Sequence, residues 1–519
     1  MALASEQEKQ SSGPGEPGGA VHTIREIAAR ARTAQASWAV LPYAQRAAKL
    51  KKAGRYLASH IDEITETIHR ENGKLRMDAL AAELLPAVLA LSYYVKRGRK
   101  FLASRKLRGG SLLMFNKQGR LVKKPWGVVG IISPWNYPFA IPFSEAVMAL
   151  LAGNAVILKT ASVTPGAGRA IAGIAGAADL PEGLFTHVEI PGLEAGPAFI
   201  SGGVDKLFFT GSTATGKEIM ARAAPCLLPL VLELGGADAA IIRADADLDR
   251  AALGILWSGF SNSGQSCGGA QRVLVHRDVY RPFLEKLCVL VRNFRAGEGE
   301  DADLGPMTTV KQKEAVEKQI AACLAMGAKI AAQSAAPGPA VPFPPERFIP
   351  AMVLTDLGPE MPLMTGEIFG PVVGVCPVQD DDEALRIANS SSYGLTGSVW
   401  SKNRQRAREI AGRMNAGAVM INDHLMSHGL AETPWGGFGD SGLGKTHGEA
   451  GFAEMCKTTV VVDDVLPGVR RNLWWHPYSE KVFRGIRAAA AFAAASPLSE
   501  KLRSIPPLLG IFFRYWTKE

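Results

Sequence analysis

The stretch 127–138, GVVGIISPWNYP, begins as an apolar strand that breaks at Pro134. The residues that follow predict a helix near 140–152, a strand over 154–159 (NAVILK) and a helix near 165–177. Strands that alternate with helices indicate a parallel sheet with right-handed crossovers. This stretch therefore places the chain in the α/β class.

The same alternation continues in two units along the chain. The first unit adds a strand over 205–211, a helix from Ser212 and a strand over 230–236. The second unit follows Cys267. Its expected strands cover 272–276, 370–378, 397–401 and 416–422, and its expected helices cover 278–294, 309–326, 381–389 and 403–414. Expected helices over 22–39, 43–71 and 76–105 precede both units.

Two further segments predict a small additional sheet. Residues 111–127 (SLLMFNKQGRLVKKPWG) are expected to form a hairpin that turns at 117–119. The run 457–464 (KTTVVVDD) is expected to be a late strand that pairs with this hairpin.

Composition indicates a globular protein in a reducing compartment. The chain has 519 residues, 47% of them hydrophobic and 21% charged, which predicts a soluble protein of about three domains. Its six cysteines are widely spaced, with neither a CxxC zinc pair nor a disulfide scaffold, so we expect a cytoplasmic location and no metal site. Residues 1–20, rich in Ser, Gly, Pro and Glu, predict a disordered tail and no signal peptide.

The net charge of +9 is concentrated near the C-terminus. From Pro467 to the end, nine basic residues stand against three acidic ones, so this tail carries +6 of the total. A basic tail predicts contact with an anionic surface. It argues against a nucleic-acid-binding body.

Three glycine patterns are candidates for a phosphate-binding turn. Those at 13–18 and 437–442 follow no expected strand, so chance and a structural loop explain them better. The turn at 211–217 (GSTATGK) follows a strand and opens a helix, which is the setting for an anion at a helix N-terminus. Glu218 stands where a P-loop needs a Ser or Thr hydroxyl for magnesium, which excludes an NTPase. A plain strand-to-helix turn is the alternative.

The run 260–272, FSNSGQSCGGAQR, surrounds Cys267 with small and polar residues, as an accessible thiol requires. A nucleophilic cysteine needs a base and an oxyanion partner. Glu233 ends an expected strand, and Asn136 follows another. Each alone is more often structural. Together, at the ends of strands in one α/β array, they fit the rule that ligands bind at the carboxyl ends of strands.

These residues belong to a larger set of motifs. Asn136, Lys159, the turn from Gly211 to Gly216, Glu233, Cys267, EIFGP (367–371) and PWGGFGDSG (434–442) stand in the order and at the spacings of the aldehyde dehydrogenase superfamily, which the chain resembles from about residue 25 to 464. The resemblance implies a Rossmann-type dinucleotide-binding domain (21–105 and 126–233), an α/β catalytic domain (234–445), an oligomerisation sheet (106–125 and 446–464) and a C-terminal amphipathic helical extension (465–519).

The resemblance also implies a mechanism. Cys267 would attack an aldehyde, and Asn136 with the backbone N–H of Cys267 would hold the oxyanion of the thiohemiacetal. Hydride transfer to a nicotinamide would leave a thioester, and Glu233 would activate water to hydrolyse it. Relatives that pass the acyl group to coenzyme A typically lack this glutamate, so its presence favours hydrolysis.

NAD or NADP is the implied cofactor. The residues that the resemblance assigns to it are Trp135, Lys159, Ser162, Gly211, Ser212, Glu367 and Phe369. Lys159 would bind the adenosine ribose, Ser212 the pyrophosphate, and Glu367 the nicotinamide ribose. The chain departs from the family pattern at Ser162, where the family often has a glutamate that repels a 2′-phosphate. We therefore expect NADP to be tolerated or preferred.

The substrate is expected to be a medium- or long-chain aliphatic aldehyde. The residues that the resemblance places near the tunnel include no basic side chain: Tyr137, Ala140, Ile141, Ser144, Ser266 and Gly268. Arg272 is interpreted as structural, and His424 and His428 are placed in a loop that could border the entrance, outside the catalytic set. A succinate-semialdehyde-type dehydrogenase and a non-catalytic cofactor-binding scaffold are the alternatives.

The tail beyond residue 464 predicts contact with a membrane surface. Its last apolar run, 508–513, is too short to span a bilayer, but basic and aromatic residues are mixed with it. The tail resembles the C-terminal extension of fatty aldehyde dehydrogenases, which recruits the enzyme to membranes. Packing against a partner subunit is the alternative, since the family implies a homodimer or tetramer.

Overall fold

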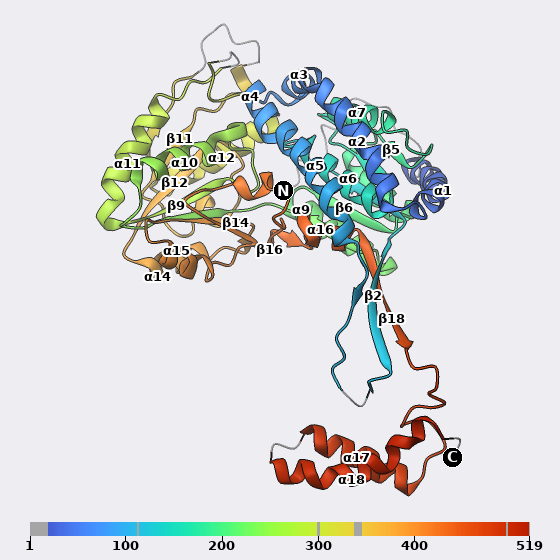
Figure 1. Ribbon diagram of the computed structural model, residues 1–519. Helices are drawn as coiled ribbons and strands as arrows, with labels where there is room; N and C mark the ends of the chain where they lie inside the picture. The colour runs from blue at the N-terminus through green and yellow to red at the C-terminus, as the bar shows by residue number, and fades with distance from the viewer. Residues whose placement is uncertain (1–18, 112–113, 298–300, 337–344, 495–496, 518–519) are drawn as a thin grey trace. The chain divides into compact units, whose positions relative to one another are not determined.

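The computed structural model describes residues 19–111, 114–297, 301–336, 345–494 and 497–517 (Figure 1). The chain forms two compact units. Unit 1 comprises Met1–Leu102 and Pro125–Lys457, and unit 2 comprises Ala103–Lys124 and Thr458–Glu519. Of the expected disordered tail, residues 19 and 20 belong to the first helix, and the rest lies outside the described residues, as does the glycine pattern at 13–18.

The first sheet of unit 1 has the strand order β17-β7-β6-β3-β4-β5. Its strands are β3 (Val128–Ile132), β4 (Ala155–Lys159), β5 (Phe185–His187), β6 (Lys206–Thr210), β7 (Leu230–Glu233) and β17 (Gly442–Leu443). All neighbours pair in parallel except β17 with β7. The predicted parallel α/β arrangement is thus confirmed, although β5 and the helix after it had no clear signal in the sequence.

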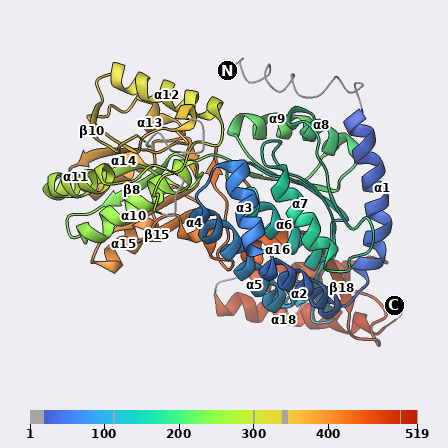
Figure 2. The same cartoon turned by 90° about the horizontal axis from the view of Figure 1, so that it is seen from above.

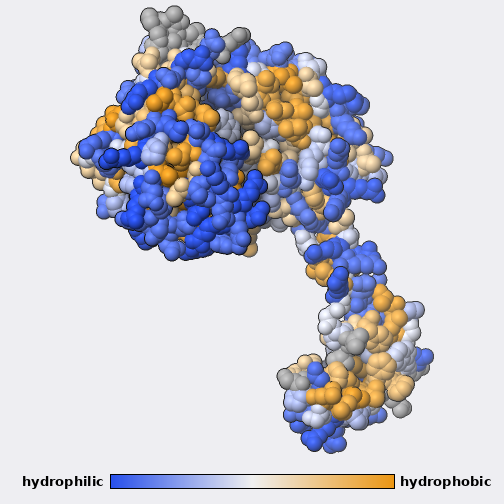
Figure 3. Space-filling view, turned by 60° about the vertical axis from the view of Figure 1, so that its left-hand side comes forward, coloured by the Kyte–Doolittle hydropathy of each residue, from blue (hydrophilic) through white to orange (hydrophobic). Residues whose placement is uncertain are grey.

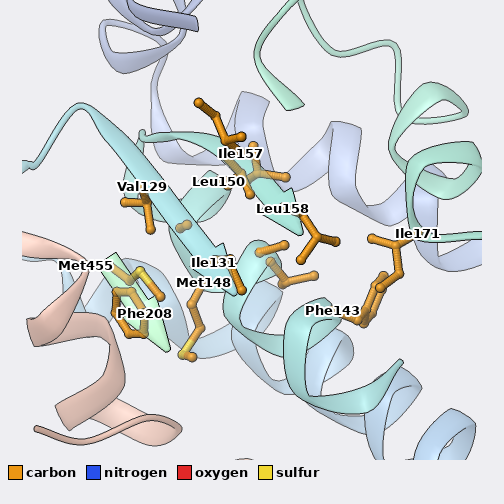
Figure 4. Packing of buried hydrophobic residues seen from close by; sticks show 14 of the residues in the cluster. Val129, Ile131, Phe143, Met148, Leu150, Ile157, Leu158, Ile171, Phe208 and Met455 are labelled. Carbon is orange, nitrogen blue, oxygen red and sulfur yellow. The ribbon is translucent and has the colours of Figure 1, made fainter. Parts of the chain in front are cut away.

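Helices cover both faces of this sheet, as Figure 2 shows from above. The crossovers are α6 (Ala140–Ala152), α7 (Pro165–Gly176), α8 (Gly192–Gly202) and α9 (Thr213–Ala223), and the N-terminal helices are α1 (Gly19–Ala39), α2 (Tyr43–Ser59) and α3 (Ile61–Asn72). α1 packs against α8, whereas α2 and α3 pack against α7. Residues of the sheet and of these helices form one apolar core, part of which is drawn in Figure 4.

Two predicted helices proved wrong in detail. The helix expected over 43–71 is broken at His60, between α2 and α3. The helix expected over 76–105 ends at Phe101 and comprises α4 (Arg76–Ala79), the π-helical turn η2 (Leu80–Leu84) and α5 (Leu85–Phe101). Pro86 has no N–H and its ring clashes with the carbonyl four residues earlier, which accounts for the local change of hydrogen-bond pattern.

The segment Arg76–Phe101 is long and apolar enough to cross a membrane by length and composition. In unit 1 its buried side chains include Ala87, Leu91 and Tyr94, which belong to the core around the first sheet. It therefore packs as a core helix.

The second sheet of unit 1 has the order β10-β11-β12-β9-β8-β14-β15. Its strands are β8 (Asp238–Ile242), β9 (Ala270–His276), β10 (Lys329–Gln333), β11 (Met352–Thr355), β12 (Val372–Val378), β14 (Thr396–Trp400) and β15 (Ala418–Ile421). The helices are α10 (Leu248–Phe260), α11 (Arg277–Arg292), α12 (Val310–Ala325), α14 (Asp381–Ala388) and α15 (Arg404–Ala411). The second α/β unit is confirmed, with β8, α10, β10 and β11 added. Apolar cores occupy both faces of this sheet.

Unit 2 contains a three-stranded sheet of order β1-β2-β18. β1 is Arg105–Lys106, β2 is Lys117–Pro125 and β18 is Cys456–Asp464. The hairpin turn expected at 117–119 is wrong, because these residues lie inside β2, and Lys106 pairs with Arg120. Gly119 allows a close approach instead, since an added Cβ would lie 3.2 Å from the Leu107 side chain. The late strand at 457–464 is confirmed.

The C-terminal part of unit 2 is a helical hairpin of α17 (Glu480–Ala494) and α18 (Leu498–Phe512). The two helices approach closely at Gly485, where a Cβ would lie 2.5 Å from Ile511. Phe115 joins this hairpin through ring contacts with Phe512 at 5.8 Å and Tyr515 at 5.3 Å.

Candidate active site

The three predicted catalytic residues line one cavity of about 310 Å³. Asn136 follows β3, and Glu233 is the last residue of β7, so both lie at the carboxyl edge of the first sheet. Cys267 stands just before β9, at the amino edge of the second sheet. The prediction that the site lies at the carboxyl ends of strands is thus correct for the first sheet and wrong for the second. The chain passes directly from the end of β7 to the start of β8, so the carboxyl edge of the first sheet faces the amino edge of the second.

Small residues around Cys267 are required by close contacts. A Cβ on Gly264 would lie 2.1 Å from the carbonyl oxygen of Gly370, and one on Gly268 would lie 2.7 Å from the Trp435 ring. Asn262 and Ser263, with φ of 52° and 56°, precede Gly264 in left-handed conformations. Such strain persists only where surrounding contacts fix the backbone, which is frequent at functional sites.

The Cys267 thiol lies deep in the protein but keeps part of its surface open to the cavity. Burial raises its pKa, and the carboxyl groups of Glu367, Asp238 and Glu233 raise it further. A thiol in such surroundings is protonated at neutral pH. The thiol must therefore lose its proton before Sγ can act as a nucleophile.

Glu233 is 5% exposed, and neither of its carboxyl oxygens has a hydrogen-bond partner among the described residues. Its pKa is raised by burial and, next, by the charge of Glu145, while Lys445 opposes the rise. An added Cβ on Gly436 would lie 2.8 Å from Glu233 Oε1, so only glycine leaves the carboxyl this space. A carboxyl whose pKa is raised and whose oxygens are unbonded has the properties of a general base near neutral pH.

Glu145 was missed in the sequence. It lies in α6, whose thirteen residues are all buried. Burial raises the pKa of Glu145 to about 8. The available signal was a single acidic residue within the otherwise apolar run AIPFSEAVMALLA.

All seven predicted cofactor residues line this cavity or a second one of about 690 Å³. Lys159 and Ser162 line the larger cavity, Ser212, Glu367 and Phe369 line the smaller, and Trp135 and Gly211 line both. Trp135 and Phe369 meet edge to face at 5.5 Å. The two cavities therefore adjoin at Trp135 and Gly211, with Cys267 in the smaller.

Local contacts fit these cavities to a dinucleotide. Ser212 caps α9, because its Oγ accepts from the N–H of Thr215 at 3.3 Å. A helix N-terminus of this kind can bind an anion through its remaining first-turn N–H groups. Glu218, which stands where a P-loop would need a hydroxyl for magnesium, instead forms an ion pair with Arg222 at 3.0 Å. Glu367 Oε1 accepts from the N–H of Gly236 at 3.2 Å, and burial raises the Glu367 pKa to about 7.

Four aromatic rings form a cluster close to Cys267 and Gly268: Tyr137, His428, Trp435 and His447. The His428 ring centroid is 6.2 Å from that of Tyr137, 4.9 Å from Trp435 and 5.0 Å from His447. Burial lowers the pKa of His428 to about 4, so the imidazole is neutral. Sequence reasoning placed Tyr137 near the tunnel and His428 in a loop that could border the entrance, but it did not single out Trp435 or His447.

Two other residues have structural roles. Arg272 donates to the carbonyl oxygens of Ala237, Ile387 and Ala388, which confirms its structural interpretation. His424 is buried beside the Gly268 carbonyl oxygen at 3.1 Å and Ser398 Oγ at 2.8 Å.

Comparison with known proteins decides the family. Residues 17–461 match the model of the aldehyde dehydrogenase family. The chain belongs to the aldehyde dehydrogenase family. Like its relatives, this aldehyde dehydrogenase is an NAD(P)-dependent enzyme.

Two curated relatives illustrate the range of names in the family. The 4,4'-diapolycopene aldehyde oxidase of Methylomonas sp. is 36% identical over 83% of this chain and 79% of its own length. A protein of Mycobacterium bovis named "Putative succinate-semialdehyde dehydrogenase [NADP(+)] 2" is 35% identical over 86% of this chain and 85% of its own length.

Solved structures confirm the aldehyde dehydrogenase fold. The NAD-dependent aldehyde dehydrogenase of Sinorhizobium meliloti superposes with a TM-score of 0.81 at 30% identity, over 89% of this chain and 88% of the other. The NAD+ complex of the Bacillus cereus enzyme gives 0.80 at 31% identity, over 86% and 89%.

Proposed function

We propose that this aldehyde dehydrogenase oxidises an apolar aldehyde to the carboxylic acid, with Cys267 as nucleophile, Asn136 as oxyanion donor and Glu233 as the base for hydrolysis. The observation that carries the proposal is the convergence of these three side chains on one cavity that adjoins the larger cofactor cavity. The intact trio also argues against a non-catalytic scaffold.

The chain's own groups account for the proton and bond changes. The Cys267 thiol releases its proton to solvent, and its Sγ then bonds to the carbonyl carbon. The carbonyl oxygen becomes an anion held by the Asn136 amide and the N–H of Cys267. When bound, NAD or NADP supplies the oxidant, because its nicotinamide accepts the hydride that leaves this carbon. Glu233 then takes a proton from water as the water oxygen attacks the resulting thioester. The C–S bond breaks, the thiolate is restored and the acid departs.

The seven cofactor residues would hold the dinucleotide along both cavities. Lys159 and Ser162 would contact the adenosine part, Gly211 and Ser212 the pyrophosphate, and Glu367 and Phe369 the nicotinamide ribose and ring. Trp135 would contact the cofactor where the two cavities adjoin. Ser162 leaves no carboxylate at the position where the family often has a glutamate, and Lys159 and Lys311 line the same cavity, which supports use of NADP. Glu218 also lines this cavity, but its carboxylate is paired with Arg222. Steady-state rates with each cofactor test this. Turnover with NADP a hundredfold below turnover with NAD would reject it.

A medium- or long-chain aliphatic aldehyde fits the site best. The rings close to Cys267 are neutral, Arg272 is bonded to backbone carbonyls and Lys74 is paired with Glu83, so none of these residues offers an unpaired cation to a substrate carboxylate. The name of the mycobacterial relative favours succinate semialdehyde as the second candidate. A series of straight-chain aldehydes with succinate semialdehyde alongside, and Cys267→Ala as control, decides between them. We expect kcat/KM to rise with chain length.

The helical hairpin of unit 2 supports the proposed membrane contact. Exposed apolar side chains form a stripe along α18 that continues to the residue after it: Leu498, Leu502, Leu509 and Phe513. Figure 3 shows hydrophobic residues gathered on the C-terminal part of the chain. Basic residues Lys501 and Arg503 lie on the same helix. Deletion of 497–519 is expected to abolish sedimentation with anionic liposomes. Unchanged sedimentation would favour packing against a partner subunit.

The sheet of unit 2 supports the proposed homodimer or tetramer. β18 is an edge strand, and its three valines, Val460, Val461 and Val462, are 57%, 47% and 62% exposed. An apolar edge of this kind pairs with another chain unless it is protected. Sedimentation equilibrium of the full chain, compared with Val461→Lys, tests this pairing. The cytoplasmic location stays a prediction.

A further inference from the structure

A short segment before the first sheet forms hydrogen bonds with the backbone of two loops, the one that carries Asn136 and the one that carries Cys267. We call residues 72–83 the clamp segment, residues 133–139 the Asn136 loop and residues 261–269 the Cys267 loop. The clamp segment starts at the end of α3 and ends in the π-helical turn η2. Nothing in the proposed chemistry uses its side chains.

The clamp segment holds the Asn136 loop through three buried side chains. Asn72 Nδ2 donates to the carbonyl oxygen of Trp135 at 2.6 Å, and Lys74 Nζ donates to that of Asn136 at 2.7 Å. Glu83 Oε2 accepts from the N–H groups of Phe139 at 2.7 Å and Ala140 at 3.1 Å, at the start of α6. Consecutive peptide groups around Asn136 are thereby fixed from one side.

Lys74 and Glu83 are also bonded to each other. Lys74 Nζ lies 2.7 Å from Glu83 Oε1, and both side chains are completely buried. Lys74 Nζ also lies 4.1 Å from the centroid of the Tyr137 ring. A buried ion pair of this kind gives little net stability, because desolvation offsets its attraction. Its effect here is on geometry, because both charged groups also form hydrogen bonds with the backbone at or next to Asn136.

The same segment reaches the Cys267 loop. Asp78 Oδ2 accepts from the N–H of Asn262 at 3.1 Å, at the first of the left-handed residues. Asn262 Nδ2 donates to the carbonyl oxygens of Asn136 at 3.0 Å and Gln265 at 3.1 Å. Asn136 Nδ2 in turn donates to Gln265 O at 3.1 Å. The carbonyl of Asn136 is therefore shared between the clamp segment and the loop that carries the nucleophile.

We propose that Lys74 and Glu83 are positioning residues, which fix the Asn136 amide at the distance from Cys267 that oxyanion stabilisation requires. The inference rests on the proposed role of Asn136. A donor displaced by about 1 Å loses much of its effect on rate, and loss of one oxyanion donor costs about 10²–10³-fold in kcat.

The test is a double-mutant cycle between the pair and Asn136. The variant Lys74→Met/Glu83→Gln removes both charges together and keeps an oxygen that can accept from Phe139 N–H. We expect its kcat/KM for acylation to fall about 10- to 100-fold, with the Kd for NADP unchanged. In the Asn136→Ala background the same pair of substitutions should cause less than about a threefold further loss, because effects that share one donor are not additive.

The matched control is Arg243→Met/Asp381→Asn, the same exchange at a part-buried ion pair beyond the carboxyl end of β8, away from Cys267. We expect this control to leave kcat/KM within about twofold of the wild-type value. An equal loss in both backgrounds would show that the pair acts on the fold as a whole, and an absent loss would show that it does nothing for the reaction. Either result overturns the inference.

Two further outcomes are covered. If Lys74→Met/Glu83→Gln does not fold at the assay temperature, Glu83→Gln alone enters the same cycle under the same criteria, since its amide keeps the position and one acceptor oxygen. If Asn136→Ala keeps full acylation activity, the proposed role of Asn136 fails first, and the inference fails with it.

Discussion

The surroundings of Asn136 and of Glu233 differ in how their polar groups are bonded. Around Asn136, the backbone carbonyl accepts two hydrogen bonds, and the adjoining Lys74 and Glu83 are fully paired. At Glu233, also buried, both carboxyl oxygens lack a partner among the described residues. A satisfied network fixes geometry, whereas an unsatisfied carboxyl at raised pKa is ready to exchange a proton. We therefore propose that the site separates the residues that position the reacting groups from the residue that exchanges a proton.

The strongest test of this difference is Glu233→Gln. An amide cannot take a proton from water, so we expect the first turnover to proceed and hydrolysis of the thioester to slow by about 10²–10⁴-fold. Stopped-flow measurement should show a burst near one NADPH per active site and then a low steady rate. Glu449→Gln, an exposed residue of α16 (Gly448–Glu454), is the control. A normal steady rate would remove Glu233 from the reaction.

The substitution Lys74→Met alone disrupts the hydrogen-bonded network next to Asn136. This change leaves the Glu83 carboxylate buried without its cation, which is expected to lower the free energy of unfolding by about 3–5 kcal/mol. The neutral double variant should lose far less. Urea unfolding followed by tryptophan fluorescence measures both. Equal losses in the two variants would mean that volume rather than charge determines stability at this position.

The space around the unsatisfied carboxyl is tested by Gly436→Ala. A Cβ there would lie 2.8 Å from Glu233 Oε1 and 2.7 Å from the carbonyl oxygen of Gly444, at a φ of +140°. We expect about a tenfold slower hydrolysis with acylation retained. Gly327→Ala is the control, because it also has a positive φ but open space around it. Single-turnover kinetics of the two steps separate the effects.

The smallest effect is expected from Glu145→Gln. Glu145 is ionised only above its own pKa of about 8, and there its charge raises the Glu233 pKa. Its removal should therefore lower the Glu233 pKa and move the part of the acidic limb of the hydrolysis rate that lies above about pH 8 to lower pH. The other charged groups near Glu233, Lys445 and Glu454, remain in the variant. The pH dependence of the steady rate measures the shift. An unmoved limb, or a shift to higher pH, would contradict the prediction.

Stability gives a second readout for the same variant. The pKa of Glu145 rises from 4.5 to about 8 on folding, so the folded chain binds this proton more tightly than the unfolded chain. Its stabilising effect is complete below pH 4.5 and is lost as the pH rises to about 8. Glu145→Gln should therefore gain stability relative to the wild type at pH 9 compared with pH 5. Thermal unfolding at the two pH values tests the sign.

The sequence by itself determined the α/β class, the late strand and the family. Periodic apolar runs fix which segments are strands and helices, and these are local properties of the chain. The family motifs named Cys267, Glu233 and Asn136 together, and the structure places all three around one cavity. Where a signal was short or mixed, it misled: Lys117, Gln118 and Gly119 look like a turn but lie within β2.

Tertiary structure alone decided which residues serve the site from a distance. Glu83 lies nine positions from Lys74 in the chain and belongs to the π-helical turn η2. It comes close to Asn136 because its carboxylate bonds to Lys74 and to the N–H of Phe139, just before α6. Trp435, His428 and Glu145 come from separate loops and helices, so no spacing rule connects them with Cys267. The direction of the second sheet was equally hidden, because periodicity gives strands but not the edge at which a nucleophile stands. Long-range contacts, which depend on how the two sheets pack, settle these points.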